Sequence, residues 1–252
     1  MITVQLAAPA ACAIAGTDTD LIVTSYFSAK SDRIKALAPR DDISYIGPWY
    51  TSVRALGLNG LILHDGLSAD FITAHSTDLI SFQYHDTHRW SPNDERYIGL
   101  LTVLETTEYD RVLMTDGNDV TVNKNPFEFM TEHKLYCGTD MPQVHRLRDN
   151  GSCLQKWKTL KPLLGVSDAE SEQFLEFDHV AVGICGGPRD LMLELFTLVS
   201  NEMQRINDDR NHNFMLINWL LWKHQFPFWK GAPFTSPLFT FDKSGDYYLT
   251  HK

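Results

Sequence analysis

Two aspartates follow an apolar run in the stretch RVLMTDGNDVTVNKNPF, which covers Arg111–Phe127. Asp116 and Asp119 are separated only by Gly117 and Asn118. One interpretation is a hairpin, because a Gly-Asn pair between two β-rich runs is a recognised turn signal and would leave both acids in solvent. The other is a metal site, because carboxylate oxygens suit Mg²⁺ or Mn²⁺ held jointly with phosphate oxygens.

Three features of this stretch favour the metal site. The run RVLM is continuous and apolar, as is typical of a central strand that is buried on both faces. Because the strand precedes the acids, they lie at its carboxyl end, where open α/β sheets bind their ligands. Gly117 allows the two side chains to face one point, which an unbroken strand forbids at this spacing.

The elements that must position these acids alternate between strand-like and helix-like segments. This alternation predicts an α/β domain with a mostly parallel central sheet flanked by helices. Strands are expected at Asp20–Phe27, Gly60–Asp65, Leu79–Tyr84, Arg111–Asp116, Lys134–Asp140 and Ala181–Gly187, with two short ones at Leu238–Phe241 and Asp246–His251. Helices are expected near Trp49–Leu56, Ser91–Asp110, Arg189–Met203 and Asn211–His224. The polar segment Met141–Glu172, which carries Gly and Pro, is expected to be a long excursion near the site.

The composition bounds the class of protein. The 252 residues are 43% hydrophobic and 21% charged, which is ordinary for a soluble enzyme, and we expect one domain over 1–252. The formal net charge of −10 argues against a protein that binds nucleic acid non-specifically. No run approaches the ~20 apolar residues that span a bilayer. The four scattered cysteines, Cys12, Cys137, Cys153 and Cys185, are expected to be reduced, which indicates a cytoplasmic protein.

Four blocks of the sequence carry a resemblance to one family. The blocks are VLMTDGNDVTVNKNPF, AVGICGGPRDLM, DDRNHNFMLINWLL and YYLTHK. In the same order, they resemble the acidic DxD segment, the glycine-rich strand and helix, the acidic helix start and the closing strand of GT-A-fold nucleotide-sugar-dependent glycosyltransferases. The resemblance covers roughly Asp20 to Lys252.

This resemblance implies a Rossmann-like GT-A fold, with residues 20–140 as the nucleotide-sugar-binding half and 141–252 as the acceptor-binding half. It also implies an enzyme that depends on Mn²⁺ or Mg²⁺. Such an enzyme moves a hexosyl or pentosyl group from a UDP- or GDP-sugar to a hydroxyl of a glycan or another acceptor.

The resemblance also assigns roles to the acids. The family motif has one residue between its aspartates, whereas two separate Asp116 and Asp119. Asp119 matches the last, metal-binding aspartate, and Asp116 is expected to contact the metal, its water or the ribose. His251 matches the histidine that completes the metal site in several such families. The alternative for His251 is a frayed chain end.

Further candidates lie in the first half of the chain. Thr24, Ser25 and Tyr26 are at the end of the first strand, where this fold usually holds the nucleobase. Alternatively, they are ordinary polar residues of a strand end. Arg96 lies at the start of the helix before the acidic strand. It is expected to neutralise phosphate or to hold Asp116, unless it is a solvated surface arginine.

The second half supplies the remaining candidates. Gly186 and Gly187 would let backbone amides approach the donor sugar or the acceptor, or would form an ordinary turn. Asp208 and Asp209 precede a helix, and one of them is the candidate base for the acceptor hydroxyl of an inverting enzyme. Asp209 is preferred, although helix capping explains both acids as well.

Two other functions remain open at this point. A haloacid-dehalogenase-like phosphatase also ends an apolar strand in an acid-and-glycine turn, but it needs aspartates two positions apart, and Asp116 and Asp119 are three apart. A non-catalytic carbohydrate-binding module would keep its function when both aspartates are replaced by alanine.

Overall fold

The computed structural model describes residues 19–30, 38–87, 89–140, 144–238, 244 and 246–252. The strands are β1 (Asp20–Tyr26), β2 (Gly60–His64), β3 (Ile80–Tyr84), β4 (Arg111–Thr115), β5 (Val120–Val122), β6 (Leu135–Gly138), β7 (Ala181–Pro188), β8 (Phe228–Lys230) and β9 (Leu249–His251). The helices are α1 (Gly47–Ala55), α2 (Ala69–His75), α3 (Pro92–Thr106), α4 (Gly151–Leu164), α5 (Asp168–Leu175), α6 (Arg189–Ile206) and α7 (Asn213–Lys223). Short 3₁₀ turns are η1 (Ile43–Ile46), η2 (Pro126–Glu128) and η3 (Leu147–Asp149).

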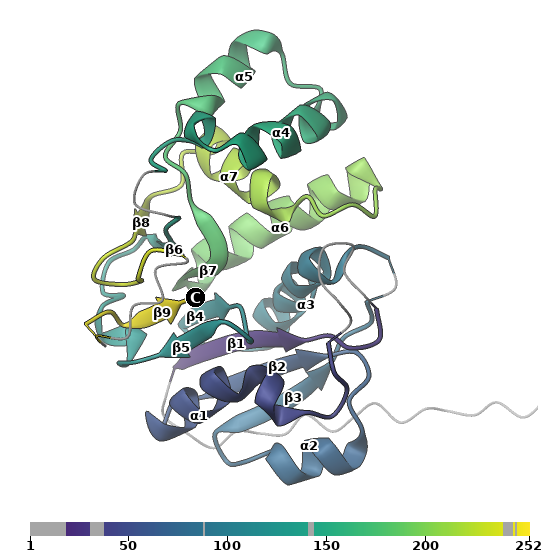
Figure 1. Cartoon of the computed structure of the whole chain (residues 1–252), viewed down its shortest axis with the longest axis vertical. Helices are drawn as coiled ribbons and strands as arrows, with labels where there is room; N and C mark the ends of the chain where they lie inside the picture. Colours follow the sequence, from purple (N-terminus) through teal and green to yellow (C-terminus); the bar gives the residue numbers. More distant parts are fainter. Residues whose placement is uncertain (1–18, 31–37, 88, 141–143, 239–243, 245) are drawn as a thin grey trace, which may run out of the picture.

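A seven-stranded sheet in the order β3-β2-β1-β4-β7-β6-β8 runs through these elements (Figure 1). The first four strands are mutually parallel, as the sequence predicts. Strand β7 then runs antiparallel to both β4 and β6, and β8 is parallel to β6. A second, two-stranded sheet joins β5 to β9. The mostly parallel sheet flanked by helices is therefore confirmed.

The reversal at β7 decides what lies beside the end of β4. Because the two strands are antiparallel, the carboxyl end of β4 meets the amino-terminal part of β7, and Thr115 pairs with Ile184. The next residue along, Asp116, donates its backbone N–H to the carbonyl of Gly183 at 2.7 Å. The acids that follow β4 are thus fixed against the beginning of β7.

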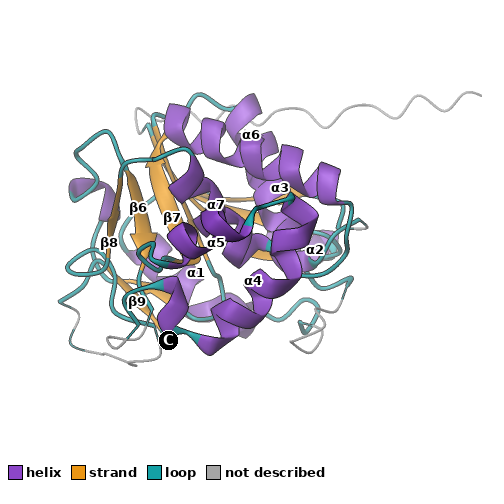
Figure 2. Cartoon of the chain, turned by 90° about the horizontal axis from the view of Figure 1, so that it is seen from above, coloured by secondary structure: helices purple, strands orange, loops and turns teal. Residues whose placement is uncertain are grey.

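The central strands are buried on both faces because each face is covered by helices. On β1, Leu21 and Val23 pack into the cluster that includes α3, α6 and α7, whereas Ile22 packs into the opposite cluster with Trp49 of α1. Alternation of side chains along a strand requires this arrangement. Seen from above, α3, α6, α7 and α4 lie together on one side of the molecule (Figure 2). No helix within the described ranges is long and apolar enough to cross a membrane.

Helix α3 begins where its capping residues predict. The side chain of Ser91 accepts a hydrogen bond from the backbone N–H of Asp94, and Pro92 occupies the first turn. An N-cap hydroxyl satisfies a donor that the helix itself leaves unpaired. The cap therefore fixes the start of the helix that carries Arg96.

The prediction of a long excursion over Met141–Glu172 is wrong. Most of this segment forms α4 and the first part of α5. Cys153, Trp157 and Leu160 form the buried stripe of α4, and the polar and charged residues that lie between them obscure this spacing in the sequence. Gly165 ends α4 in the left-handed conformation.

The expected C-terminal strands are only partly present. Strand β9 occupies the last three residues of the expected segment Asp246–His251. The other expected strand, Leu238–Phe241, lies almost wholly outside the described residues, as does Cys12. Cys137, Cys153 and Cys185 are free thiols, as expected.

Candidate active site

Three side chains with metal-binding atoms meet at the carboxyl end of β4. Asp116 follows β4 directly, and Asp119 immediately precedes β5. Strand β9 pairs antiparallel with β5, with His251 opposite Val120, and the backbone N–H of Lys252 donates to the carbonyl of Asp119 at 2.9 Å. This pairing brings the histidine to the acids across more than half of the chain.

The geometry of Asp116, Asp119 and His251, called the acid–histidine cluster below, fits a divalent cation. One ligand atom from each residue lies within 4.8 Å of the others. The Nε2 atom of His251 is 3.6 Å from Oδ2 of Asp116 and 3.8 Å from Oδ1 of Asp119. That Oδ1 atom is buried and has no hydrogen-bond partner among the described residues. A buried carboxylate oxygen without a partner is costly, and a cation would satisfy it.

Two glycines make room for the cluster. A Cβ atom at Gly183 would lie 2.5 Å from Oδ2 of Asp116 and 2.8 Å from Cε1 of His251, so any other residue there would displace these side chains. A Cβ atom at Gly117 would lie 2.7 Å from Oγ1 of Thr24. Gly117 is not among the described glycines with positive φ. The two acids do face one point, as expected of the turn that contains Gly117, and the structure adds that a glycine is needed there for close approach to β1.

Arg96 is directed at the cluster from α3. Its Nη1 atom forms an ion pair with Oδ1 of Asp116, and its Nη2 atom donates to the hydroxyl of Tyr97 at 2.8 Å. The side chain is 8% exposed, so it is not a solvated surface arginine. The contact with Asp116 is one of the two interactions expected of Arg96, and neutralisation of phosphate stays a prediction.

A cleft that opens to solvent borders the cluster. It is lined by Ser25, Phe27, Lys30, Ala38, Tyr45, Pro92, Asn93, Arg96, Asp116, Gly117 and Asn118. Lys30 and Arg96 bring positive charge to its wall, and Tyr45 brings an aromatic ring. Burial, together with the charge of Asp119, raises the pKa of the Tyr45 hydroxyl, which stays neutral and able to donate. The cleft is thus suited to an anionic ligand with a flat ring.

Only one of the three residues expected at the nucleobase lines this cleft. Ser25 lies in its wall. Thr24 is fully buried and donates through Oγ1 to the carbonyl of Thr115 at 3.0 Å. Tyr26 is fully buried, and its hydroxyl lies among backbone groups of Pro39 and Asp42. The structure places Thr24 and Tyr26 in the supports of the cleft.

Gly186 and Gly187 lie farther along β7, within the sheet. Gly186 pairs with Leu113, and a Cβ atom there would lie 2.7 Å from Cδ1 of that leucine. A Cβ atom at Gly187 would lie 3.0 Å from the carbonyl of Lys134. Sequence reasoning missed Gly183, which belongs to the same glycine-rich run and lies against the cluster.

Asp208 and Asp209 lie in the connection between α6 and α7, outside the residues that line the cleft. Asp208 forms ion pairs with Arg210 and, at 3.4 Å, with Nε2 of His212. Hydrogen bonds from Arg210 hold the pKa of Asp208 well below its usual range. The connection is tied to α3, because the buried carboxylate of Asp94 accepts from the backbone N–H of His212. It therefore lies beside the helix whose first turn borders the cleft.

Asp65, at the end of the expected strand Gly60–Asp65, has a structural role. Its carboxylate accepts from the backbone N–H groups of Ser28 and Ala29, at 2.6 Å and 3.1 Å, and from Oγ1 of Thr87 at 2.7 Å. These bonds tie the end of β2 to the segment that follows β1.

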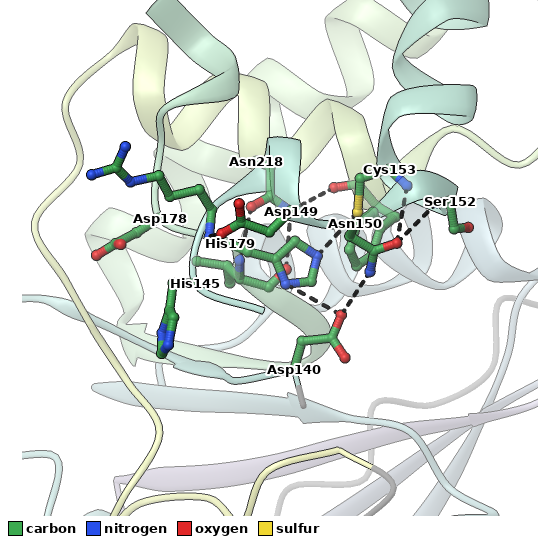
Figure 3. A network of polar contacts seen from close by, with 12 residues as sticks. Asp140, His145, Asp149, Asn150, Ser152, Cys153, Asp178, His179 and Asn218 are labelled. Atoms are coloured by element: carbon green, nitrogen blue, oxygen red, sulfur yellow. Dashed lines mark hydrogen bonds and ion pairs between the residues drawn. The ribbon is translucent and has the colours of Figure 1, made fainter. Parts of the chain in front are cut away.

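A second polar network, which sequence reasoning missed, joins the segment after β6 and the segment before β7 to the start of α4 (Figure 3). The Sγ atom of Cys153 lies 3.2 Å from Nε2 of His179, whose Nδ1 atom lies 3.3 Å from Oδ2 of Asp140. Asn150 donates to the same oxygen at 3.1 Å. Burial lowers the pKa of His179 to about 4 and raises that of Cys153 to about 12. A thiol held neutral in this way is a poor nucleophile, so this chain of contacts connects elements rather than performing acyl transfer.

Comparisons with known proteins bear on the fold. No protein-family model and no curated protein sequence matches this chain. Similar solved structures include two of the galactosyltransferase LgtC, one in complex with donor and acceptor sugar analogs and one of an active-site mutant. Each has a TM-score of 0.53 and 13% sequence identity, and the match covers 92% of this chain and 86% of that one.

The chain has the GT-A fold. The resemblance to GT-A-fold glycosyltransferases that four sequence blocks carry is thereby confirmed at the level of the fold. Within this GT-A fold, the acid–histidine cluster lies at the carboxyl end of a central parallel strand, where open α/β sheets bind ligands.

Proposed function

We propose that this protein is a metal-dependent glycosyltransferase, which moves a sugar from a nucleotide-diphosphate sugar to a hydroxyl of a glycan or another acceptor. One observation carries the proposal: Asp116, Asp119 and His251 converge beside a cleft with a cationic wall. The GT-A fold is shared with LgtC, whose structure was determined with donor and acceptor sugar analogs. The fold similarity favours this function over the phosphatase alternative.

The difficult step in such a reaction is the departure of the nucleoside diphosphate from the sugar. A divalent cation, Mn²⁺ or Mg²⁺, supplies positive charge that stabilises this leaving group when bound by the acid–histidine cluster. Arg96 adds a fixed positive charge beside Asp116, and Lys30 adds another in the same cleft. Ser25 and Tyr45 line the cleft where a base and ribose would lie.

The remaining roles are proposed from the sequence. Residues 20–140 would hold the donor, a UDP- or GDP-sugar, and residues 141–252 the acceptor. Thr24 and Tyr26 would support the nucleobase site from the buried core behind the cleft. Gly186 and Gly187 would affect the donor sugar or the acceptor indirectly, by setting the position of β7. In an inverting enzyme, Asp209 would take the proton of the acceptor hydroxyl with Asp208 beside it. The cytoplasmic location stays a prediction.

A thermal-shift panel of UDP, GDP and ADP, each with Mn²⁺ or with a chelator, tests the proposal. A ligand present at 100 times its Kd stabilises the folded state by about 2.7 kcal/mol. At about 2–4 °C per kcal/mol for a chain of this size, the expected shift is roughly 5–11 °C, and only with metal. The absence of a shift with every nucleotide would overturn the proposal.

Two variants separate the possible outcomes. Asp119→Ala should lose the metal-dependent shift, because it removes a ligand of the cluster. Asp209→Asn should keep the shift, because it leaves the cluster intact, and in an inverting enzyme it should lose transfer, because it removes the base. A carbohydrate-binding module would bind its sugar equally well with Asp116 and Asp119 both replaced by alanine, and that result would favour the non-catalytic alternative.

A further inference from the structure

A closed ring of contacts connects Tyr97 of α3 to the acid–histidine cluster. The hydroxyl of Tyr97 donates to the carbonyl of Val182 on β7 at 2.8 Å and accepts from Nη2 of Arg96 at 2.8 Å. Arg96 in turn forms an ion pair with Oδ1 of Asp116. The backbone N–H of Asp116 returns to β7 by donating to the carbonyl of Gly183 at 2.7 Å. Two successive peptide groups of β7 therefore hold Asp116, one directly and one through Tyr97 and Arg96.

Packing in the core holds Tyr97 in place in addition to its hydrogen bonds. The residue is fully buried, and its ring stacks on Phe196 of α6 at a centroid distance of 5.2 Å and an interplanar angle of 10°. Val182 lies where the pairing of β6 with β7 shifts register, beyond Cys137. Such irregularities re-aim groups at the rim of a sheet. Here the carbonyl of Val182 is directed at the Tyr97 hydroxyl.

The ring divides the two oxygens of Asp116 between two partners. Oδ1 faces Arg96, whereas Oδ2 faces Nε2 of His251 at 3.6 Å. A carboxylate that could rotate freely would present its oxygens to the cation less often in the required orientation. The contact with Arg96 fixes that rotation, and Tyr97 fixes Arg96.

We propose that Tyr97 is a positioning residue of the metal site, which acts by holding the Arg96 guanidinium so that Oδ2 of Asp116 points toward Asp119 and His251. The inference rests on the proposed function in one respect, since it takes the cluster to be the cation site. Tyr97 itself touches neither the cation nor the donor.

Electrostatic repulsion and positioning predict opposite effects of loosening Arg96 on the affinity for the cation. Arg96 carries the same sign of charge as a bound cation, so electrostatics alone predicts that loosening Arg96 strengthens cation binding. Positioning predicts the reverse. Tyr97→Phe separates the two effects because it keeps every charge and the ring that packs on Phe196, and removes only the hydroxyl.

The first test is the Kd for Mn²⁺, measured by isothermal titration on the full chain. The matched control is Tyr50→Phe, which removes another buried hydroxyl that donates to a backbone carbonyl, that of His75, at 2.8 Å. Loss of an outer partner of a metal ligand typically weakens affinity by about 10- to 100-fold. We expect about tenfold weaker binding in Tyr97→Phe and unchanged binding in Tyr50→Phe. Equal affinity in all three proteins, or tighter binding in Tyr97→Phe, would overturn the inference.

The second test does not need the cation. The buried Nε–H of Arg96 gives an NMR signal that can be assigned by its loss in Arg96→Lys. We expect a sharp signal in the wild type and in Tyr50→Phe, and a broadened or shifted one in Tyr97→Phe. An unchanged signal in Tyr97→Phe would overturn the positioning role. Failure of the wild type to bind Mn²⁺ would instead contradict the metal site, and the NMR comparison would still decide whether Tyr97 holds Arg96.

Discussion

Gly183→Ala is the smallest change that should disable the acid–histidine cluster while adding no charge or polar group. The added Cβ atom would lie 2.5 Å from Oδ2 of Asp116 and 2.8 Å from Cε1 of His251. Cβ contacts under 3.0 Å essentially never occur, so the carboxylate or the strand must retreat by at least half an ångström. Ligand distances in metal sites hold to within about 0.2 Å. The required movement exceeds this tolerance.

The size of the effect follows from that comparison. We expect the Kd for Mn²⁺ to rise by about 10- to 100-fold, the loss that is typical when a group that orients a metal ligand is removed. Each factor of ten corresponds to about 1.4 kcal/mol of binding free energy. Crowding should also lower the free energy of unfolding by about 1–3 kcal/mol. The variant should therefore remain folded at 25 °C and bind the cation poorly.

Gly186→Ala is the matched control for this variant. It adds the same methyl group to the same strand, where it would crowd the Leu113 side chain at 2.7 Å and the backbone carbonyl of Val112 at 2.8 Å, both on β4. It should lower the melting temperature at least as much as Gly183→Ala does, because it crowds backbone as well as a side chain, and it should weaken Mn²⁺ binding less than Gly183→Ala does. Isothermal titration and thermal unfolding on both variants give the comparison. If Gly183→Ala binds Mn²⁺ as tightly as the wild type, the argument that room beside Asp116 Oδ2 is needed for the cation is refuted.

Two further predictions concern buried residues outside the acid–histidine cluster. Because burial lowers the folded-state pKa of His179 from 6.5 to about 4, the unfolded chain takes up the proton first as pH falls, and stability present above pH 6.5 is lost toward pH 4. Urea unfolding should show that the free energy of unfolding falls by about 2 kcal/mol between pH 7.5 and pH 5 because of His179, and that His179→Gln lacks this fall. Equal falls in both proteins would contradict the prediction. Tyr26→Phe should lower the free energy of unfolding by about 0.5–1.5 kcal/mol, because it leaves half-buried backbone groups of Asp42 without their partner. Nucleotide affinity, measured by titration, should be unchanged, and a large loss would instead place the Tyr26 hydroxyl at the nucleobase.

The position of the acids could be predicted because it depends on local sequence. A continuous apolar run becomes a strand that is buried on both faces, and the residues that follow it must lie at its carboxyl end. Asp116 and Asp119 lie there. The resemblance to a known family suggested His251, and the pairing of β9 with β5 places it against the acids.

The rest of the site depends on pairings between distant segments. Whether Gly183 or Gly186 lies beside Asp116 is decided by the antiparallel register of β4 and β7, which no local pattern specifies. Tyr97 reads in the sequence as one apolar position of a helix, and only the fold directs its hydroxyl to Val182. Helix α4 was missed for another reason. Its Gly, Pro and polar residues suggested a loop, but in the structure they lie on the exposed surface and at the cap of a helix.

The central claim is that Asp116, Asp119 and His251 hold the cation that binds a nucleoside diphosphate. The most direct test is a crystal grown with MnCl₂ and UDP or GDP, with diffraction data recorded above and below the Mn absorption edge. We predict a single anomalous peak within roughly 2.0–2.6 Å of Asp116 Oδ2, Asp119 Oδ1 and His251 Nε2, in contact with the diphosphate. A nucleotide bound elsewhere, or a crystal with no peak at these three atoms, would contradict the claim.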